Sequence, residues 1–275
     1  FKEESNNDED FAKRLGSLGD IYINDAFSCS HRKQASIHNI TKFIKKSFAG
    51  PLLKKEINAI NLVIQNKKEP VTCIIGGSKI STKINVISSL IEKVNNLVIV
   101  GAMANNFFIY KNLKIGKSLV EENTNEIIKT IYEKANKNKC KIIIPEDCMV
   151  GSSFTSDGIN KDINTIEDND IILDIGTKTI EVLKKIIDQS KTVLWNGPAG
   201  YFENENFLIG TMSIAEAISK NTVENSIISI LGGGDTLAAI KQSKNKLFFT
   251  HLSTAGGAFL EYLEGKDLPG LSVLK

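Results

Sequence analysis

From Pro70 onward, short β-branched runs alternate with longer helical patterns, and this alternation constrains the fold more than any other feature. The runs lie at 71–75, 97–100, 141–144, 171–174, 192–195, 226–231 and 247–250. Helical patterns fill most of the gaps, at 79–95, 123–138, 177–190, 207–220, 236–243 and 257–264. Apolar strands that alternate with helices are typical of a parallel sheet covered on both faces. The predicted fold class is therefore α/β, with a Rossmann-like, doubly wound parallel sheet.

The part of the chain before Pro70 is organised differently. A short capped helix is predicted over 8–18, and a short strand over 21–24, followed by a polar loop. Segment 51–66 has apolar residues at helical spacing and Pro51 at a first helical position, so it predicts a helix that joins two domains. The predicted domains are a small N-terminal part at 1–48, the joining helix at 49–66 and the sheet domain at 67–275.

Composition excludes several classes of function. The 34 basic and 32 acidic residues leave a net charge of +2, which does not suggest a nucleic-acid partner. No apolar run approaches the roughly 20 residues that cross a bilayer. The N-terminal residues FKEESNNDED lack a basic-then-apolar leader, and the four cysteines form no C-x-x-C. We therefore expect a cytoplasmic protein with free thiols, without a nucleic-acid or membrane partner.

Four of the predicted strand ends lead into glycine-rich turns. These turns are Gly76-Gly-Ser-Lys79, Asn196-Gly-Pro-Ala-Gly200, Gly232-Gly-Gly-Asp-Thr236 and Ser253-Thr-Ala-Gly-Gly257. Glycine lets backbone N–H groups approach a ligand closely, and the N-terminus of a following helix favours an anion. A single such turn is explained by turn chemistry alone, but four at one sheet edge indicate a phosphate-binding site. The sequence lacks G-x-G-x-x-G, and Gly116-Lys-Ser118 lacks the remaining features of a P-loop.

Charged residues near these turns each have two interpretations. Asp235 would repel a phosphate unless Mg²⁺ lay between them, but it could equally be a helix N-cap. Lys79 and Lys83 are four residues apart at the start of a predicted helix, so they are expected to share one face of it, where cations are unfavourable unless an anion is bound. The alternative is a pair of solvated lysines in a lysine-rich chain.

Two further residues are candidates on weaker grounds. Glu203 could accept hydrogen bonds from ribose hydroxyls, or be an ordinary loop acid. Arg32 is one of two arginines in the chain and follows His31 in a loop, so it could grip a carboxylate or a phosphate.

The sequence resembles the phosphoglycerate kinase family from its first residues to its end. The matching stretches are Gly19–Phe27, His31-Arg32, Ala35-Ser36, Gly76–Lys83, Gly116–Glu121, Leu173–Gly176, Trp195–Pro198, Gly200, Phe202-Glu203, Gly232–Thr236, Ser253-Thr254, Gly256–Ala258 and Leu263–Lys266. The resemblance implies two α/β domains joined by a long helix, of which the N-terminal one binds 3-phosphoglycerate and the C-terminal one binds magnesium nucleotide. This chain resembles the last two-thirds of the family's proteins, so 1–48 would be the remnant of an N-terminal domain.

The resemblance also implies roles for individual residues. It makes Lys79 the lysine that stabilises the phosphoryl group in flight, Arg32 a contact to 3-phosphoglycerate and to that group, and Asp235 the residue associated with the metal. Gly256 and Gly257 would supply backbone donors to the transferring group. The implied nucleotide-binding residues are Gly76, Gly77, Lys83, Gly101, Leu173, Asn196, Pro198, Glu203, Gly233, Gly234, Asp235 and Thr236.

The implied reaction is reversible phosphoryl transfer from 1,3-bisphosphoglycerate to ADP, which gives ATP and 3-phosphoglycerate in glycolysis, by a monomer that uses Mg²⁺. Five residues stand where the family usually has glycine: Ser28, Val100, Ala102, Ile172 and Ala255. We expect the isolated chain to bind nucleotide but to turn over little substrate, because the acceptor half is largely absent. One alternative is a nucleotide-binding fragment without catalysis. A dinucleotide-dependent oxidoreductase is less favoured, because the sequence lacks the G-x-G-x-x-G fingerprint.

Overall fold

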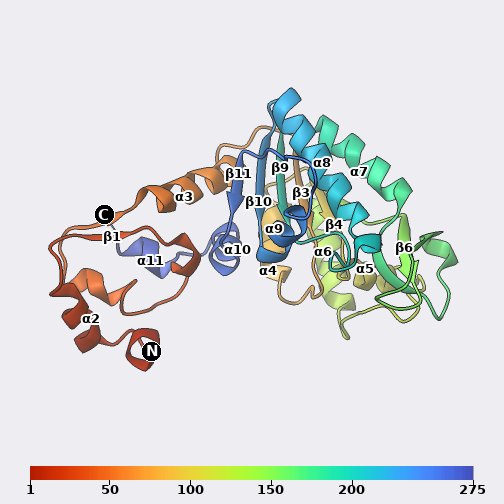
Figure 1. The fold of residues 1–275 in the computed structure, drawn as a ribbon. Coiled ribbons are helices and arrows are strands. Elements are labelled where there is room, and N and C mark those ends of the chain that lie inside the picture. Colours follow the sequence, from red (N-terminus) through yellow and green to blue (C-terminus); the bar gives the residue numbers. More distant parts are fainter. Residues whose placement is uncertain (275) are drawn as a thin grey trace. The chain divides into compact units, whose positions relative to one another are not determined.

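The structure, a computed structural model, describes residues 1–274. Its internal contacts divide the chain into two compact units. The first unit combines 1–61 with 253–275, and the second unit is the continuous segment 62–252. Figure 1 labels the elements of both units. The sequence-based boundaries differ from this division, because they assign 253–275 to the sheet domain.

The second unit is built around a parallel sheet, as the alternation of strands and helices predicted. Within the described residues this sheet has six strands in the order β11-β10-β9-β3-β4-β5. The strands are β3 (Val71–Ile75), β4 (Asn96–Ile99), β5 (Lys141–Ile143), β9 (Thr192–Asn196), β10 (Ile228–Gly232) and β11 (His251–Ser253). Strand β3 pairs in parallel with β4 on one side and with β9 on the other. The order of the strands therefore reverses between β3 and β9, which is where ligands of such sheets bind.

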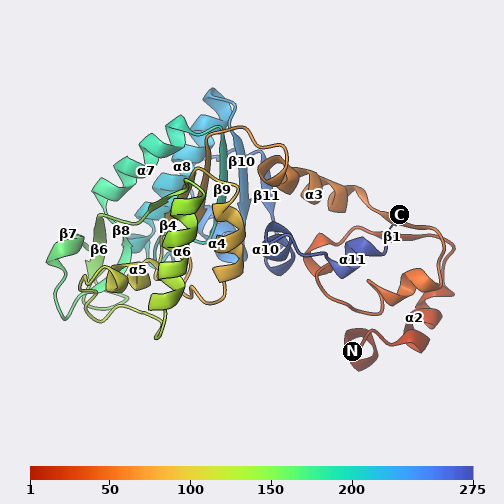
Figure 2. The same cartoon turned by 180° about the vertical axis from the view of Figure 1, so that it is seen from behind.

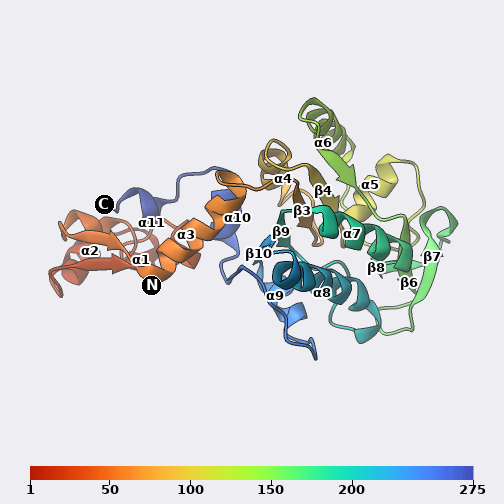
Figure 3. The ribbon, with the colours of Figure 1, turned by 90° about the horizontal axis from the view of Figure 1, so that it is seen from above.

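Helices cover both faces of this sheet. They are α4 (Ile84–Ile91), α5 (Ala104–Tyr110), α6 (Asn125–Lys137), α7 (Thr177–Gln189), α8 (Ile209–Glu224) and α9 (Gly234–Ile240). Viewed from above, α4 and α6 lie on one side of the sheet and α7 and α8 on the other (Figure 3). Ile74, Val193 and Trp195 are fully buried beneath α7 and α8 in one apolar cluster. Because both faces are covered, the strands read as continuous apolar runs.

A second sheet was not predicted. It consists of β6 (Asp147–Gly151), β7 (Ile159–Asp162) and β8 (Ile171–Ile175) in the order β7-β6-β8 (Figure 2). Strand β6 pairs antiparallel with both neighbours. The prediction that 171–174 joins the parallel sheet was therefore wrong. An apolar β-branched run is compatible with either kind of sheet, and its partner here is set by the β6 hairpin.

Two predicted element positions are also corrected. The helix predicted over 79–95 begins only at Ile84, because Gly77 has a left-handed backbone (φ +123°) and 78–83 form turns. The strand predicted over 247–250 lies instead at 251–253. At Thr250, side-chain hydroxyls replace the backbone carbonyl acceptors of a strand. The backbone N–H of Thr250 donates to the hydroxyl of Ser229 at 2.9 Å, and the backbone N–H of Ser229 donates to the hydroxyl of Thr250 at 3.0 Å.

The first unit contains α1 (Lys2–Ser5), α2 (Glu9–Gly16), β1 (Tyr22–Asn24), β2 (Ser47–Ala49), the start of α3 (Pro51–Ile64), α10 (Gly257–Leu263) and α11 (Pro269–Ser272). Asp8 caps α2 by accepting a hydrogen bond from the backbone N–H of Phe11. Strands β1 and β2 pair in parallel. Helix α3 matches the helix predicted over 51–66, and the division between the units falls within it.

The last residues of the chain pack against the N-terminal part. The backbone N–H of Gly270 donates to the carbonyl oxygen of Ser30 at 2.8 Å, and the side-chain amide of Asn24 donates to the carbonyl oxygen of Gly270. The rings of Phe27 and Tyr262 meet edge to face at 6.2 Å between centroids. These contacts explain why 253–275 belongs to the first unit.

Two expectations from composition can be compared with the fold. All four cysteines are free thiols, and three of them are buried. No helix within residues 1–274 has the length and apolar character to span a membrane.

Candidate functional site

The turns that follow β3, β4 and β9 pack against one another at the switch point of the sheet. A Cβ at Gly76 would lie 2.1 Å from the carbonyl oxygen of Pro198, and one at Gly101 would lie 2.8 Å from the backbone nitrogen of Gly77. Gly77, Gly101 and Gly197 also have left-handed φ angles of +123°, +68° and +98°. The glycines are therefore required by the close approach of three loops.

Lys83 brings a positive charge to the junction of β3 and β9. Its ammonium group donates to the carbonyl oxygen of Gly76 at 2.6 Å and to Oδ1 of Asn196 at 2.8 Å. Burial lowers the pKa of Lys83 to about 8, although Cys73 and Asp235 act in the opposite direction. A half-buried cation at this junction is suited to hold an anion.

The turn after β10 joins the same junction. Gly233 has a left-handed backbone (φ +101°), and α9 begins at Gly234. The hydroxyl of Thr236 is buried and accepts a hydrogen bond from the backbone N–H of Gly197 at 2.7 Å. Asp235 is the second residue of α9 and not its N-cap, which is Gly233. The N-cap interpretation of Asp235 is thus not supported, and its exposed side chain borders the cavity described next.

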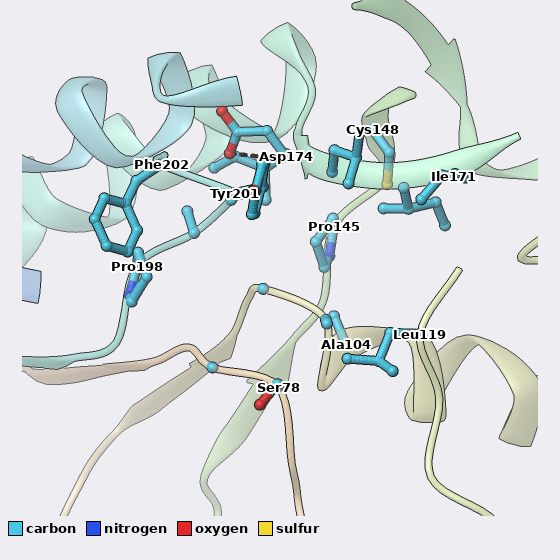
Figure 4. A pocket seen from close by; sticks show the side chains of 18 of the residues that line it. Ser78, Ala104, Leu119, Pro145, Cys148, Ile171, Asp174, Pro198, Tyr201 and Phe202 are labelled. Atoms are coloured by element: carbon cyan, nitrogen blue, oxygen red, sulfur yellow. Dashed lines mark hydrogen bonds between the residues drawn. The ribbon is translucent and has the colours of Figure 1, made fainter. Parts of the chain in front are cut away.

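A cavity of about 330 Å³ opens beside these turns. In Figure 4, Ile171, Cys148, Asp174 and Tyr201 lie on one side of it, and Ser78, Ala104 and Leu119 lie on the other. Its remaining lining residues are Gly77, Gly101, Ala102, Phe108, Pro145, Phe154, Ile172, Leu173, Ile175, Pro198, Ala199, Gly200, Phe202, Glu203 and Asp235. The mostly apolar lining suits a flat organic group.

Lys79 and Lys83 do not share a helix face, contrary to the sequence prediction, because α4 begins after both of them. Lys79 lies on an exposed turn, and Lys83 folds back toward Gly76. The turn is held in place by Glu121, whose carboxylate accepts hydrogen bonds from Ser81 N–H at 3.1 Å and from its hydroxyl at 2.5 Å.

The remaining predicted site residues belong to the first unit. Arg32 is exposed, and the neighbouring His31 packs on Gly257, where a Cβ would lie 2.9 Å from Nε2 of His31. Nothing lies within 4 Å of a Cβ built at Gly256. Arg32, Gly256 and Gly257 are thus in one unit, whereas the predicted nucleotide-binding residues and Lys79 are in the other.

A metal site built only of protein side chains is not present in residues 1–274, where no three His, Cys, Asp or Glu side chains cluster in a way that could hold an ion. Among the residues that the sequence did not single out, Asp174 and Cys148 line the cavity directly. An acidic residue inside the apolar run Ile171-Ile-Leu-Asp-Ile175 was the available signal for Asp174. For Cys148 there was none, because strand β6 was not predicted.

The switch point, the glycine turns and Lys83 together define a doubly wound α/β protein in which a half-buried ammonium group lies at the junction of the turns, beside an apolar cavity. The profile of the phosphoglycerate kinase family matches residues 1–266. The chain therefore belongs to the phosphoglycerate kinase family.

Individual relatives agree with this assignment. The chain is 47% identical over 277 residues to the phosphoglycerate kinase of Wolbachia pipientis wMel, and this match covers 100% of the chain and 69% of the relative. It is 44% identical to the phosphoglycerate kinase of Chlorobaculum tepidum over 274 residues, with the same 69% share of the relative. The solved structure of phosphoglycerate kinase from Coxiella burnetii superposes with a TM-score of 0.89 at 38% identity, covering 98% of this chain and 69% of that one.

Proposed function

We propose that this protein catalyses the reversible transfer of a phosphoryl group from 1,3-bisphosphoglycerate to ADP, which gives ATP and 3-phosphoglycerate. The observation that carries the proposal is the junction of the turns after β3, β9 and β10, which line an apolar cavity. The ammonium group of Lys83 joins the first two of these turns, and the hydroxyl of Thr236 joins the third to Gly197. Membership of the phosphoglycerate kinase family supports the reaction type. The proposal includes a monomeric enzyme of glycolysis that acts in the cytoplasm.

The nucleotide is assigned to the second unit. The base occupies the apolar part of the cavity, between Leu173 and Pro198, and Glu203 accepts hydrogen bonds from the ribose hydroxyls. The phosphates lie at the Gly233–Thr236 turn and near Lys83. This assignment follows the chemistry of the groups, because the cavity lining is mostly apolar whereas the ammonium group of Lys83 lies at the junction of the turns after β3 and β9.

Asp235 is assigned to the nucleotide's magnesium ion. The residue fits this role because its carboxylate is exposed at the cavity edge and does not serve as the N-cap of α9. Mg²⁺ commonly takes one or two carboxylates and fills its remaining positions with phosphate oxygens and water, so a larger protein cluster is not required. When bound, the ion neutralises charge on the phosphates.

The transfer itself needs positioning and charge neutralisation. The acceptor in the ATP-consuming direction is a carboxylate that is already ionised, so no general base is required. Lys79 stabilises the phosphoryl group in flight, and Gly256 and Gly257 contribute backbone donors. Arg32 binds 3-phosphoglycerate through the fork of its guanidinium group. In a turnover assay of a full-length enzyme, Lys79→Ala should therefore mainly lower kcat, whereas Lys83→Ala should mainly raise the apparent constant for the nucleotide.

Calorimetric titration of the 275-residue polypeptide with ADP, with and without Mg²⁺, tests the nucleotide assignment. We expect binding in both cases and tighter binding with Mg²⁺. Asp235→Ala should weaken binding of the magnesium complex more than binding of free ADP. Equal weakening of both would remove the metal role from Asp235, and binding of NAD in preference to ADP would favour an oxidoreductase.

Turnover by the same polypeptide should be low. The first unit carries Arg32 on a loop beside a sheet that has two strands in the described residues, and such sheets have marginal stability. A mobile Arg32 would not hold the acceptor. A coupled assay that gave the same turnover as a phosphoglycerate kinase of a relative would contradict this expectation, without bearing on nucleotide binding.

A further inference from the structure

Asp174 is a buried carboxyl group in the wall of the cavity, and the reaction proposed above does not use it. The residue lies on β8 and is 2% exposed. Its Oδ2 accepts a hydrogen bond from the backbone N–H of Gly210 at 2.7 Å, and its Oδ1 accepts one from the backbone N–H of Ile175 at 2.8 Å. Figure 4 shows it beside Tyr201 on one side of the cavity.

The carboxylate is wedged between two glycines from different elements. A Cβ at Gly200 would lie 2.4 Å from Oδ1 of Asp174, and a Cβ at Gly210 would lie 2.3 Å from the same atom. Gly200 belongs to the loop after β9, and Gly210 is the second residue of α8. One side chain therefore fixes the spacing between β8, the loop after β9 and the first turn of α8.

These three segments carry the part of the cavity assigned to the nucleoside. Leu173 precedes Asp174 on β8, and its carbonyl oxygen accepts a hydrogen bond from the backbone N–H of Tyr201 at 2.6 Å. Pro198, Tyr201 and Glu203 all lie on the loop that Gly200 belongs to, and all three line the cavity. A shift of Asp174 would thus move both faces of the nucleoside site together.

Burying a carboxyl group away from water costs free energy, so Asp174 needs contacts that offset this cost. Burial raises the pKa of Asp174 to about 8, although the N–H groups of Gly210 and Ile175 act to lower it. The titratable groups near this carboxyl include the buried thiol of Cys148 and the phenol of Tyr201 (Figure 4). The backbone N–H groups of Gly210 and Ile175 offset this free-energy cost. The hydrogen bonds of Asp174 are therefore made to the main chain of segments around the cavity.

We propose that Asp174 is a positioning residue for nucleotide binding, which holds Leu173 and the 198–203 loop at the separation that a nucleoside requires. The inference rests on the proposed nucleotide site. Asp174 does not contact the phosphates in this assignment, which fall to Lys83 and the Gly233–Thr236 turn. Its removal should therefore weaken the binding of adenosine and of ADP by the same factor.

Asp147 provides a matched control. It is 3% exposed and likewise accepts backbone hydrogen bonds at the start of a helix, from the N–H groups of Lys178 and Thr179. It differs in that it does not line the cavity. Substitution of Asp147 therefore reports the general effect of removing a buried helix-capping carboxylate.

The experiment compares Asp174→Asn, Asp147→Asn and Lys83→Met in the 275-residue polypeptide, by calorimetric titration with ADP and with adenosine. Leaving a buried N–H group poorly paired corresponds to about a tenfold loss of affinity. We expect Asp174→Asn to lose about tenfold for both ligands, Lys83→Met to lose affinity for ADP only, and Asp147→Asn to bind as the unsubstituted protein does.

Trp195 supplies a spectroscopic readout of the same loop. It is the only tryptophan, is fully buried, and donates its indole N–H to the carbonyl oxygen of Gly197 at 2.7 Å. Its emission should change in folded Asp174→Asn and stay constant in Asp147→Asn. Unchanged emission together with unchanged affinity in folded Asp174→Asn would overturn the inference.

If Asp174→Asn fails to fold, as judged by circular dichroism, Gly210→Ala decides the question. Gly210 does not line the cavity, but its new methyl group would press on the carboxylate of Asp174. The same loss for both ligands is expected, and affinity equal to that of the unsubstituted protein would overturn the inference. Failure of the unsubstituted protein to bind ADP would instead overturn the proposed function.

Discussion

The two units of this protein contain parallel strands in very different surroundings. In the second unit, every residue of β3 and β9 is buried, because helices cover both faces of the sheet. In the first unit, β1 and β2 leave Ile23 and Phe48, which are paired across the two strands, 58% and 43% exposed. Parallel sheets are found almost only where both faces are covered. By this criterion, the helices of the second unit cover its parallel sheet, whereas the sheet of the first unit leaves apolar side chains uncovered.

The largest expected difference is in the free energy of unfolding. Phe107→Ala in the second unit removes a fully buried ring and should cost about 3–5 kcal/mol. Phe48→Ala is the matched change in the first unit, and it should cost less than about 1 kcal/mol because the ring is half exposed. Urea unfolding followed by circular dichroism measures both. Equal costs would show that the sheet of the first unit is covered in solution.

Amide hydrogen exchange rates should differ between the two units of the unsubstituted protein. Amides of β3, β9 and β10 open only when the second unit unfolds, whereas those of β1 and β2 open locally. We expect exchange to be about 100-fold slower in the first group. Mass spectrometry of peptic fragments provides the measurement, and similar protection before Pro51 and after Pro70 would refute the comparison.

Nucleotide affinity should depend on one unit only. Lys83→Met removes a cation that lies at the junction of β3 and β9, and should weaken ADP binding by about 10- to 100-fold, as expected for loss of a charge-assisted hydrogen bond. Arg32→Met in the first unit should leave ADP affinity unchanged. A comparable loss in both variants would mean that the nucleotide also contacts the first unit.

The smallest expected effect is a pH dependence. Burial lowers the pKa of Lys83 to about 8, so the free protein loses this charge as the pH rises through 8. A bound phosphate favours the charged form, so binding takes up a proton and weakens with rising pH. ADP affinity should fall about three- to tenfold between pH 7 and pH 9. Lys83→Met should remove most of this slope, and an unchanged slope would assign it to another group, such as Asp174.

Elements whose burial is uniform could be predicted from the sequence. The runs at 71–75 and 192–195 were placed correctly because both faces of their strands are buried, which leaves an uninterrupted apolar signal. Strand β7, Ile159-Asn-Lys-Asp162, is largely exposed and carries no such signal. Strand β8 was found but given the wrong neighbours, since a run of apolar residues does not encode its partner.

The candidate site was predictable to a similar extent. Glycines are recognisable because the close approach of Gly76 to Pro198 excludes every other residue. The folding back of Lys83 toward Asn196 was not recognisable, since helical periodicity continued through 79–83 and concealed the turns. The role of Asp174 depends on Gly200 and Gly210, which come 26 and 36 residues later in the chain, and no local pattern reports such contacts.

The division of the chain has a consequence for its synthesis. The second unit is one continuous segment, whereas the first is completed only by 253–275, whose residue Gly270 bonds to Asn24 and Ser30. Because a ribosome releases the chain from its N-terminus, residues 62–252 can fold as a whole while the first unit still lacks its final segment. The N-terminal residues therefore lack their contacts to this segment until residues 253–275 have been synthesised. A pause or a cleavage near residue 252 would leave the second unit intact and the first unit without these contacts.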